Sequence, residues 1–415
     1  MSREGEVLER VLAVNRSLAR SLDLTTLLSQ VVDTALELLD AERGSVFLHE
    51  PASGTLVSRV ATGTGELRIP ADRGIVGECV ATREIVLVAD AYADPRFNRQ
   101  VDLATGYRTR SMLTMPLIGH DDTLVGVLQV LNKRGGSFGD ADLPIATALA
   151  ATCAIAIQRM RLLEEIVEKR RMERELEVAR DIQTRVFPKS MPEIPGYDVA
   201  GWSRPADQTG GDIFDVIAAP GSVLLLLGDA TGHGVGPAIS VTQVRAMLRI
   251  AARLGAGLDH TFRNINDQLS DDLSDNRFVT AFLGVLDPAS HRVVYHAGGQ
   301  GPLLHWRAAE RTIDWLTSST LPLGMLPFRK TPESRWIDMA PGDVLALVSD
   351  GIFECENAAG EAFGNERAGA IVSAGTGAAE TVARMVAEAD AFRGSAPQQD
   401  DMTVLVLRRR AAGRD

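Results

Sequence analysis

Residues 222–234, SVLLLLGDATGHG, join a strongly apolar run to an acidic turn that is rich in glycine. The apolar run is typical of a buried β-strand, and the glycines after it allow the backbone to turn tightly. Asp229 is therefore expected at the end of a strand, at the edge of a sheet. Taken alone, an acidic turn of this kind usually has only a structural role, because aspartate and glycine are common turn residues.

Three further acidic clusters flank strand-like segments in the same half of the chain. They are TGGDIFD at 209–215, SDG at 349–351 and DDMT at 400–403. Several carboxylates brought together repel one another strongly unless a cation neutralises them. A site made only of oxygen ligands suits Mg²⁺ or Mn²⁺, whereas zinc prefers nitrogen and sulfur. Together, the four clusters predict a centre for divalent metal ions.

The pattern of apolar residues predicts two structured units. Strand-like segments dominate from Tyr197 onward, with helical stretches at about 236–254, 259–274 and 378–391. These strands are too numerous and too hairpin-like for an alternating βαβ arrangement, so the pattern predicts an α+β domain. In the N-terminal half, the same pattern predicts helices over about 6–40, then an antiparallel sheet of short strands, and a closing helix over about 140–160.

A highly charged helical segment follows the closing helix. Its apolar residues repeat at the spacing of a short coiled coil, at Met172, Leu176, Ala179 and Val186. Gln183 occupies a position where an apolar residue is expected. The segment is predicted to be either a coiled coil that joins two copies of the chain or a single solvated helix.

The composition of the 415-residue chain restricts the function classes. A net charge of −12 and a pI near 5.2 argue against a nucleic-acid-binding protein, which normally has a basic face. The N-terminus has no signal-peptide pattern, and no apolar run approaches the roughly 20 residues that span a bilayer. Cys79, Cys153 and Cys355 lie far apart, so buried free thiols are expected. These features predict a cytoplasmic protein.

The segment from about Arg180 to Arg409 resembles the bacterial branch of the PPM-type phosphatases, the SpoIIE/RsbU-like regulators of sigma-factor pathways. The resemblance rests on these stretches, in this order: ARDIQTRVFP, RPADQTGGDIFD, GDATGHGVGPAIS, FVTAFLGVLD, LPLGM, LVSDGIFECENAAGEAFG and DDMTVLVL. It implies an αββα sandwich that holds two or more Mn²⁺ or Mg²⁺ ions. It also implies a protein serine/threonine phosphatase in which metal-activated water attacks the phosphate directly.

The resemblance implies roles for individual acidic residues. Asp229 resembles the carboxylate that bridges both metals, and Ala230 would supply a backbone carbonyl beside it. Asp350 and Asp400 resemble the remaining ligands of the first metal. Asp212 resembles the acidic group of the second metal, bound directly or through water. Asp229 and Asp350 are therefore expected to be catalytic.

Other residues of the site are less clearly assigned by the resemblance. Asp215 and Asp401 would hold the metal ligands in place without binding a metal themselves. His233 would be either a general acid for the leaving group or the partner in a turn-stabilising hydrogen bond. The chain departs from the family at HAGGQ, residues 296–300, where an NAGHN-like turn is common. The phosphate-gripping arginine of eukaryotic relatives has no clear counterpart, although Arg204 is nearby in sequence.

Residues 20–160 resemble a GAF domain, a family that binds small molecules or serves as a dimer scaffold. The resemblance rests on RGSVFLHEPASGTLVSRVATG, GIVGECVATREIVLVADAYADPRF and SMLTMPLIGHDDTLVGVLQVLNK. The pattern of cyclic-nucleotide-binding members is partly matched, by Asn132, Lys133, Phe138 and Asp142, with Leu143 in place of the final glutamate. The resemblance thus implies a sensor, with a cyclic nucleotide, another small molecule or no ligand.

The predicted organisation is an N-terminal helix at 1–22, a GAF sensor domain at 23–158, a helical linker at 159–187 and a phosphatase domain at 188–410. The implied function is dephosphorylation controlled by the sensor, acting on a phosphorylated STAS-type anti-anti-sigma protein. A homodimer through the linker and the GAF helices is expected. Two alternatives stay open: a phosphatase-like module that only binds a partner, and a ligand sensor that signals purely by dimer rearrangement.

Overall fold

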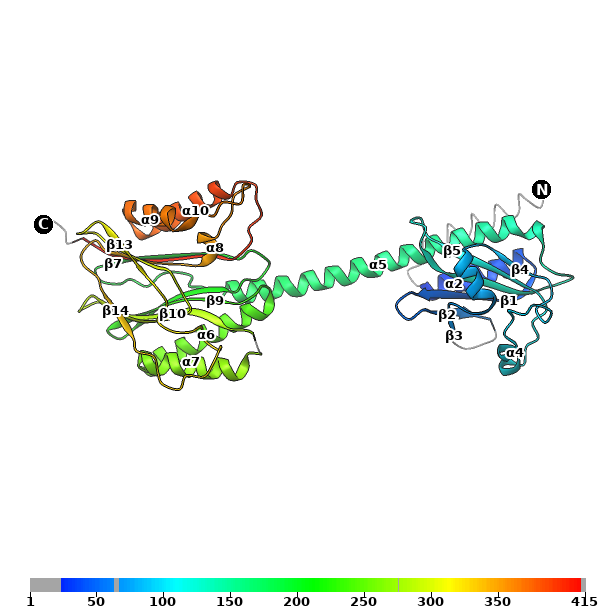
Figure 1. Ribbon diagram of the computed structural model, residues 1–415, viewed down its shortest axis with the longest axis horizontal. Coiled ribbons are helices and arrows are strands. Elements are labelled where there is room, and N and C mark those ends of the chain that lie inside the picture. Colours follow the sequence, from blue (N-terminus) through cyan, green and yellow to red (C-terminus); the bar gives the residue numbers. More distant parts are fainter. Residues whose placement is uncertain (1–23, 63–66, 275, 412–415) are drawn as a thin grey trace. The chain divides into compact units, whose positions relative to one another are not determined.

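The computed structural model describes residues 24–62, 67–274 and 276–411, so the helix predicted at 1–22 lies outside the described residues. The chain divides into two compact units, residues 1–171 and 172–415. Figure 1 shows β-sheet structure in each unit. Each unit also has its own hydrophobic core. The domain boundary predicted at 158/159 falls inside a helix, α5, which runs without a break over Leu143–Thr184.

The first unit is built on one antiparallel sheet of six strands in the order β3-β2-β1-β6-β5-β4. Its strands are β1 Ala41–Glu50, β2 Thr55–Ala61, β3 Arg68–Pro70, β4 Val86–Val88, β5 Met112–Ile118 and β6 Leu124–Lys133. Its helices, besides the start of α5, are α2 Leu24–Leu38, α3 Gly74–Thr82, α4 Arg99–Thr105 and the short η1 Asp140–Asp142. The antiparallel sheet and the closing helix agree with the sequence pattern.

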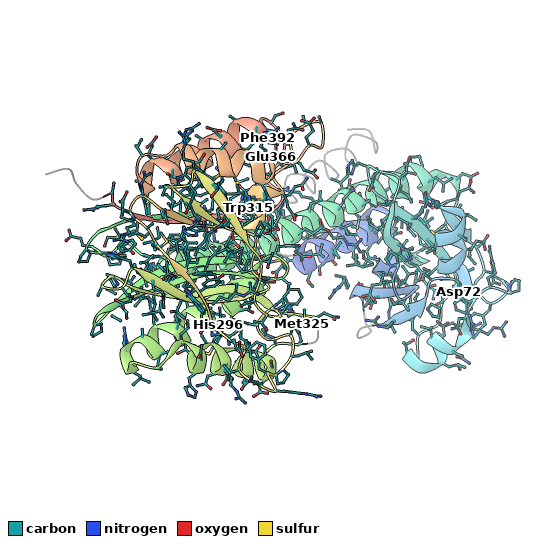
Figure 2. The ribbon with its side chains drawn as sticks, turned by 60° about the vertical axis from the view of Figure 1, so that its left-hand side comes forward. Asp72, His296, Trp315, Met325, Glu366 and Phe392 are labelled. Carbon is teal, nitrogen blue, oxygen red and sulfur yellow. The ribbon has the colours of Figure 1, made fainter. Side chains whose placement is uncertain are left out.

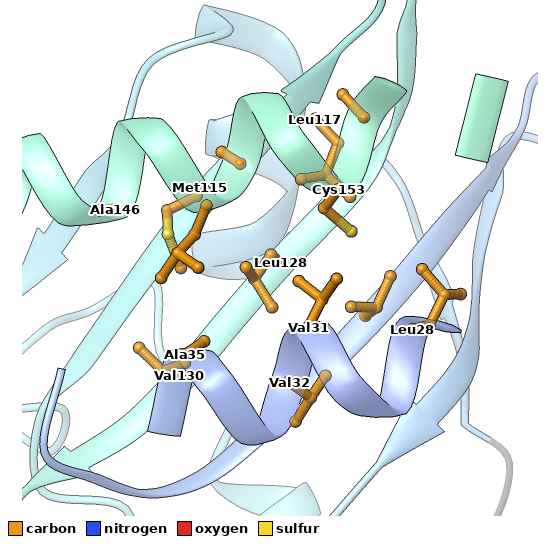
Figure 3. Packing of buried hydrophobic residues seen from close by; sticks show 14 of the residues in the cluster. Leu28, Val31, Val32, Ala35, Met115, Leu117, Leu128, Val130, Ala146 and Cys153 are labelled. Atoms are coloured by element: carbon orange, nitrogen blue, oxygen red, sulfur yellow. The ribbon is translucent and has the colours of Figure 1, made fainter. Parts of the chain in front are cut away.

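Two helices cover one face of this sheet and form its main core (Figure 3). α2 contributes Leu28, Val31 and Ala35, which are three or four residues apart and therefore share one side of the helix. The first half of α5 contributes Ala146 and Cys153 to the same cluster. A second cluster, which includes residues of α3, covers the opposite face.

Within the described residues, the helical stretch Asp140–Thr184 is long and apolar enough to cross a membrane by length and composition alone. Half of its most apolar window is buried inside the protein. Leu149 and Ile157 in this window are fully buried members of the first unit's core. This burial is typical of the core helix of a soluble domain.

All three cysteines are free and buried, as the sequence predicts. Burial raises the pKa of the Cys79 and Cys153 thiols to about 12, and it also raises the pKa of Cys355. The three side chains therefore stay protonated and belong to the hydrophobic cores.

The second unit contains two antiparallel five-stranded sheets with the orders β14-β11-β10-β9-β8 and β13-β12-β15-β16-β7. The strands of the first sheet are β8 Asp212–Ala219, β9 Ser222–Ala230, β10 Val279–Asp287, β11 Arg292–Gly298 and β14 Arg335–Asp338. Those of the second are β7 Tyr197–Arg204, β12 Leu303–Arg307, β13 Thr312–Leu316, β15 Val344–Val348 and β16 Met402–Arg409. The helices are α6 Val235–Leu254, α7 Leu258–Asp272, α8 Asp350–Phe353, α9 Gly364–Ala374 and α10 Ala378–Arg393.

The two sheets pack face to face, with one helical layer outside each (Figure 1). Leu225 and Leu227 of β9 meet Leu345 and Leu405 of the other sheet in the central core. α6 and α7 pack on the outer face of the first sheet, and α9 and α10 pack on the outer face of the second. The architecture is the αββα sandwich that the resemblance implies. The sequence pattern predicts α6, α7 and α10 but does not predict α9.

The C-terminal part of α5 contacts the second unit through two positions of the coiled-coil pattern. Gln183 is buried and forms hydrogen bonds with the backbone of Gly210. Val186, just after the helix, packs against the core beneath α6. These two positions therefore serve packing within the second unit, while Met172 remains exposed.

Candidate active site

Two of the acidic residues lie directly opposite each other on neighbouring strands. Asp212 at the start of β8 pairs in register with Asp229 near the end of β9. Side chains alternate along a strand, so Asp229 continues the row of Leu225 and Leu227 that faces the other sheet. Both carboxylates therefore lie at one edge of the space between the two sheets.

The opposite sheet supplies the other acidic residues at the same edge. Ser349 and Thr403 tie the ends of β15 and β16 together, with a hydrogen bond of 2.8 Å from the Thr403 amide to Oγ of Ser349. Asp350 begins α8 directly after this tie, and Asp400 and Asp401 directly precede β16. Gly351 is needed here because a Cβ would collide with the backbone of Asp401.

Asp401 links the loops of the two sheets. Its Oδ1 accepts a hydrogen bond of 2.7 Å from the Ala206 amide, and its Oδ2 accepts one of 3.3 Å from the Asp212 amide. Its carboxylate also lies where a Cβ on Gly210 would be. Asp401 thus holds the segment that leads into β8 beside the end of β16.

Burial and mutual repulsion raise the pKa values of several of these carboxylates. Burial, together with the charges of Asp350, Asp400 and Asp401, raises the pKa of Asp229 to about 8. Burial and the charge of Asp229 raise the pKa of Asp212 well above its usual range. Burial also raises the pKa values of Asp350 and Asp401. The four acidic clusters of the sequence therefore interact at one place.

The residues fit the divalent cations that the sequence predicts. Among the described residues, no hydrogen-bond partner is found for the buried Oδ2 of Asp212 or for the buried Oγ1 of Thr209. The carbonyl oxygen of Ala230 and Oδ1 of Asp229 are neighbours, since they lie 2.6 and 3.3 Å from the position of a Cβ on Gly211. All these donors are oxygen atoms, which suits Mg²⁺ or Mn²⁺.

The carboxylates are nevertheless not packed into a closed cage. Among the described residues, no three His, Cys, Asp or Glu side chains lie close enough together to hold an ion by themselves. Mutual repulsion of like charges favours this spacing. A metal here would have to draw on backbone carbonyl and water oxygens as well as on the carboxylates.

Asp215 lies apart from this group. It pairs in register with Leu226, which belongs to the core under α6, so it points to the opposite face of the sheet from Asp212. Its fully buried carboxylate accepts hydrogen bonds of 2.6 and 2.8 Å from Arg249 and forms an ion pair of 2.7 Å with Arg245. Asp215 therefore connects β8 to α6.

His233 lies on the exposed turn after β9. Its ring is 90% exposed, and Nδ1 lies 3.3 Å from a carboxylate oxygen of Asp207. This contact links the turn to the segment before β8. The exposed ring is accessible from solvent.

The two departures from the family pattern have local explanations. His296 (Figure 2) is fully buried, stacks on Phe262 and places Nε2 2.7 Å from Asp259 of α7. Burial lowers the pKa of His296, so its ring stays neutral and fastens α7 to β11. Arg204 is held by Asp390 through hydrogen bonds of 3.0 and 2.6 Å. Its guanidinium is therefore already paired inside the protein.

Gln183 was not expected at the site. Its Nε2 donates to the Gly210 carbonyl over 2.6 Å, and its Oε1 accepts from the Gly210 amide over 3.1 Å. Gly210 is two residues before Asp212, so this amide pair connects α5 to the segment that carries a predicted metal ligand. The only sequence signal is a polar residue where the helix pattern expects an apolar one.

The first unit contains a separate cavity of about 290 Å³. Its wall is mainly apolar, with Phe47, Ile75 and Met112 among its lining residues. Arg43 also lines it, and the guanidinium carbon lies 3.8 Å from the ring centre of Tyr107. Within the described chain, no carboxylate forms an ion pair with Arg43.

The residues that partly match the cyclic-nucleotide pattern serve internal contacts. Lys133 forms hydrogen bonds of 2.7 and 2.6 Å with Asp142, and the fully buried Asn132 donates to the Tyr107 hydroxyl over 2.8 Å. Neither these three residues nor Phe138 lines the cavity. Any ligand specificity must therefore come from other side chains.

Comparisons with known families match both units. The family model described as Stage II sporulation protein E (SpoIIE) matches residues 219–410, and the model described as GAF domain matches residues 23–157. Among solved structures, the SiaA-PP2C domain of Pseudomonas aeruginosa aligns with a TM-score of 0.51 and 20% identity, over 58% of this chain and 98% of that chain. The RsbU and RsbW domains of a Mycobacterium tuberculosis protein align with 25% identity and a TM-score of 0.45, over 55% of this chain and 64% of that chain.

Curated relatives include the cGMP-specific 3',5'-cyclic phosphodiesterases of Drosophila ananassae and Drosophila melanogaster. Each is 32% identical to this chain over 198 residues, which is 43% of this chain. The chain covers only 17% of the length of each of these relatives. The likeness to the phosphodiesterases is therefore confined to a part of those proteins.

Proposed function

Because the chain joins a GAF domain to a domain of the SpoIIE family of PP2C-type protein phosphatases, we propose that it hydrolyses phosphoserine or phosphothreonine on a protein. The observation that carries the proposal is the meeting of Asp212, Asp229, Asp350 and Asp400 at one edge of the sandwich. The charges of Asp350 and Asp400 help to raise the pKa of Asp229, and the charge of Asp229 helps to raise that of Asp212, so the site gains stability when a cation binds.

The residues at this edge divide into ligands and supports. Asp229, the Ala230 carbonyl, Asp350 and Asp400 would hold the first metal, and Asp212 would bind the second directly or through water. When bound, Mg²⁺ or Mn²⁺ supplies a water of lowered pKa and stabilises charge on the phosphoryl oxygens.

Two residues support or assist these ligands. Asp401 accepts amide hydrogen bonds from the loop before β8 and so keeps the two sheets' ligands in register. His233 is exposed on the adjacent turn, where it can donate a proton to the departing serine or threonine oxygen.

The substrate is proposed to be a phosphorylated STAS-type anti-anti-sigma protein in the cytoplasm, on the strength of the family resemblance. The test is phosphate release from such a protein with and without Mn²⁺, for the wild type and for Asp229→Asn and Asp350→Asn variants. Metal-dependent release that both variants abolish, with folding preserved, is the expected result. The wild type could instead bind the phosphoprotein and release no phosphate, whichever metal and sensor ligand are added. That result would support a module that only binds a partner.

Regulation is proposed to pass along α5. Its exposed apolar side chains offer a surface for the same helix of a second copy; they include Leu162, Ile166, Val167, Val178 and Ile182. Gln183 lies at the end of this surface and bonds to Gly210, so a change in the helix pairing would reach the segment before Asp212. A homodimer measured by light scattering, converted to monomer by charged substitutions at Ile166 and Val167, is the expected outcome.

The ligand of the GAF cavity is proposed to be a small organic anion with an apolar body. The guanidinium of Arg43, which pairs with no carboxylate of the described residues, would bind the anionic group, and the apolar wall with Phe47 and Met112 would cover the rest. Because curated relatives are named as cGMP-specific phosphodiesterases, cGMP is the first probe. Calorimetry should detect binding of cGMP or of an aromatic carboxylate to the wild type. This binding should be lost in the Arg43→Gln variant. Equal binding of guanosine, which lacks the phosphate, would contradict the anionic class.

A further inference from the structure

Thr280 extends the polar edge of the sheet that carries Asp212 and Asp229. It lies on β10 and pairs in register with Asp229, which itself pairs with Asp212 on β8. Residues that lie opposite each other on antiparallel strands share one face of the sheet, so the three side chains form a row. The Thr280 hydroxyl therefore lies beside the carboxylate that is predicted to bridge two metals.

Gln300 accepts the single proton of this hydroxyl. Oγ1 of Thr280 lies 3.1 Å from Oε1 of Gln300 and 3.4 Å from the backbone carbonyl oxygen of Asp229. A hydroxyl has one proton to donate, and the shorter distance favours the bond to Gln300. Among the described residues, no hydrogen bond to the Asp229 carboxylate contributes to its raised pKa.

The backbone around Gln300 fixes the position of its side chain. Gly299 has a left-handed φ of 68°, and its amide donates to the Thr320 carbonyl over 2.9 Å. Leu323, on the same loop as Thr320, exchanges two backbone hydrogen bonds of 2.9 and 2.8 Å with Val279 of β10. Gln300 itself is buried. Its acceptor oxygen is thus a fixed part of this end of the sheet.

Without this acceptor, the proton of Thr280 would turn to Asp229. The Cβ atoms of residues that lie opposite each other are only about 5 Å apart, so a hydroxyl and a carboxylate in these positions can form a hydrogen bond. An ionised carboxylate is a stronger acceptor than a backbone carbonyl. A bridging carboxylate gives one oxygen to each metal, so a proton donated to either oxygen competes with metal binding.

We infer that Gln300 is a positioning residue of the metal centre, an assignment that rests on the proposed function. It holds the Thr280 hydroxyl away from the Asp229 carboxylate and so keeps both carboxylate oxygens available to metal. Gln300 is the last residue of HAGGQ, where the chain departs from the family pattern. The inference therefore gives this departure a role in metal affinity.

Calorimetric titration of Mn²⁺ into metal-free, full-length protein tests the inference in a double-mutant cycle. Gln300→Met nearly keeps the side-chain volume but removes the acceptor, and its Kd for Mn²⁺ is expected to rise about 10-fold. Thr280→Val removes the donor, so its Kd should match that of the wild type. The double variant should match Thr280→Val. Gln268→Met, the same substitution at an exposed position of α7, is the matched control and should leave Kd unchanged.

Recovery of Mn²⁺ affinity in the double variant is the decisive reading, because damage to packing would persist without the Thr280 hydroxyl. A Kd that stays raised in the double variant overturns the inference, as does an unchanged Kd in Gln300→Met. Thr280→Val alone tests the inference with Gln300 intact. A lowered Kd in that variant would mean that the hydroxyl already binds the Asp229 carboxylate in the wild type, which also overturns it.

The titration separates this inference from the proposed function. A wild type that binds Mn²⁺ but releases no phosphate would count against the phosphatase function, and the cycle would still decide the role of Gln300. A wild type that binds no Mn²⁺ would overturn both.

Discussion

Asp212 and Asp215 are buried carboxylates three residues apart on strand β8, yet their surroundings have opposite charge. Asp215 faces α6 and is neutralised by Arg245 and Arg249. Asp212 faces the other sheet, where its charged neighbours are the carboxylates of Asp229 and Asp401. The protein thus neutralises Asp215, which connects β8 to α6, with its own arginines. The charge of Asp212 at the sheet edge is left to be neutralised by a bound cation.

Removing a carboxylate from the unpaired group should have the largest effect. Asp229→Asn is expected to lower kcat by about 10³-fold or more, because several kcal/mol of metal-derived stabilisation would be lost. The measurement is Mn²⁺-dependent phosphate release, with circular dichroism to verify folding. Asp271→Asn, at an exposed position on α7, is the control and should retain full activity.

Removing the paired carboxylate should instead reduce stability. Asp215→Asn would leave the guanidinium groups of Arg245 and Arg249 partly buried without a counter-charge, at a cost of about 3–5 kcal/mol in the free energy of unfolding. Urea denaturation of the second unit measures this loss. Asp267→Asn, which breaks the exposed pair with Arg263, should cost less than about 1 kcal/mol. Equal losses in both variants would contradict the contrast between the two faces.

The pH dependence of stability should sharpen the same contrast in metal-free protein. The pKa of Asp229 is about 8 in the folded chain and near 3.8 when unfolded, so the folded state binds more protons between these values. The free energy of unfolding should therefore fall as pH rises from about 4 to 8. Over this pH range the free energy of unfolding should fall by on the order of 2–5 kcal/mol more in the wild type than in Asp229→Asn. Added Mg²⁺ should restore the stability of the wild type above pH 8. If the difference in the free energy of unfolding between the two proteins does not change with pH, Asp229 is not destabilised by its carboxylate neighbours.

The smallest expected effect concerns the contact between α5 and the active-site segment. Gln183→Ala removes two hydrogen bonds to Gly210 and should lower the stability of the second unit by about 1–3 kcal/mol. It should also alter how strongly the full chain responds to its sensor domain, measured as the ratio of phosphatase rates with and without the GAF ligand. Thr184→Ala is the matched control and should leave the ratio unchanged, because the Thr184 hydroxyl donates to the Arg180 carbonyl of the same helix.

Local patterns predicted an α+β domain and acidic turns at the ends of its strands, whereas the αββα layers were implied by the family resemblance. Apolar strands such as 222–227 end in acidic turns, and the structure brings these ends together through strand pairing. Asp212 and Asp215 differ by an odd number of residues and so point to opposite faces of β8. The resemblance nevertheless assigned Asp215 to the support of the metal ligands, whereas in the structure Asp215 pairs with arginines of α6. The presence of α9 was not predictable, because GNERAGAIVSAG offers few apolar residues and several glycines. The bond from Gln183 to Gly210 depends on tertiary contact with a backbone group, for which no sequence pattern exists.

The buried cysteines make the chain suitable for site-specific labelling. With pKa values raised by burial, the thiols of Cys79, Cys153 and Cys355 are protonated at neutral pH and shielded from reagents. A cysteine introduced at Val167, which is 66% exposed on α5, would then be the preferred target of a maleimide or a nitroxide. Spin–spin distances between two such labels would report helix pairing directly in the otherwise native sequence, and their change on adding a GAF ligand would follow the signal along α5.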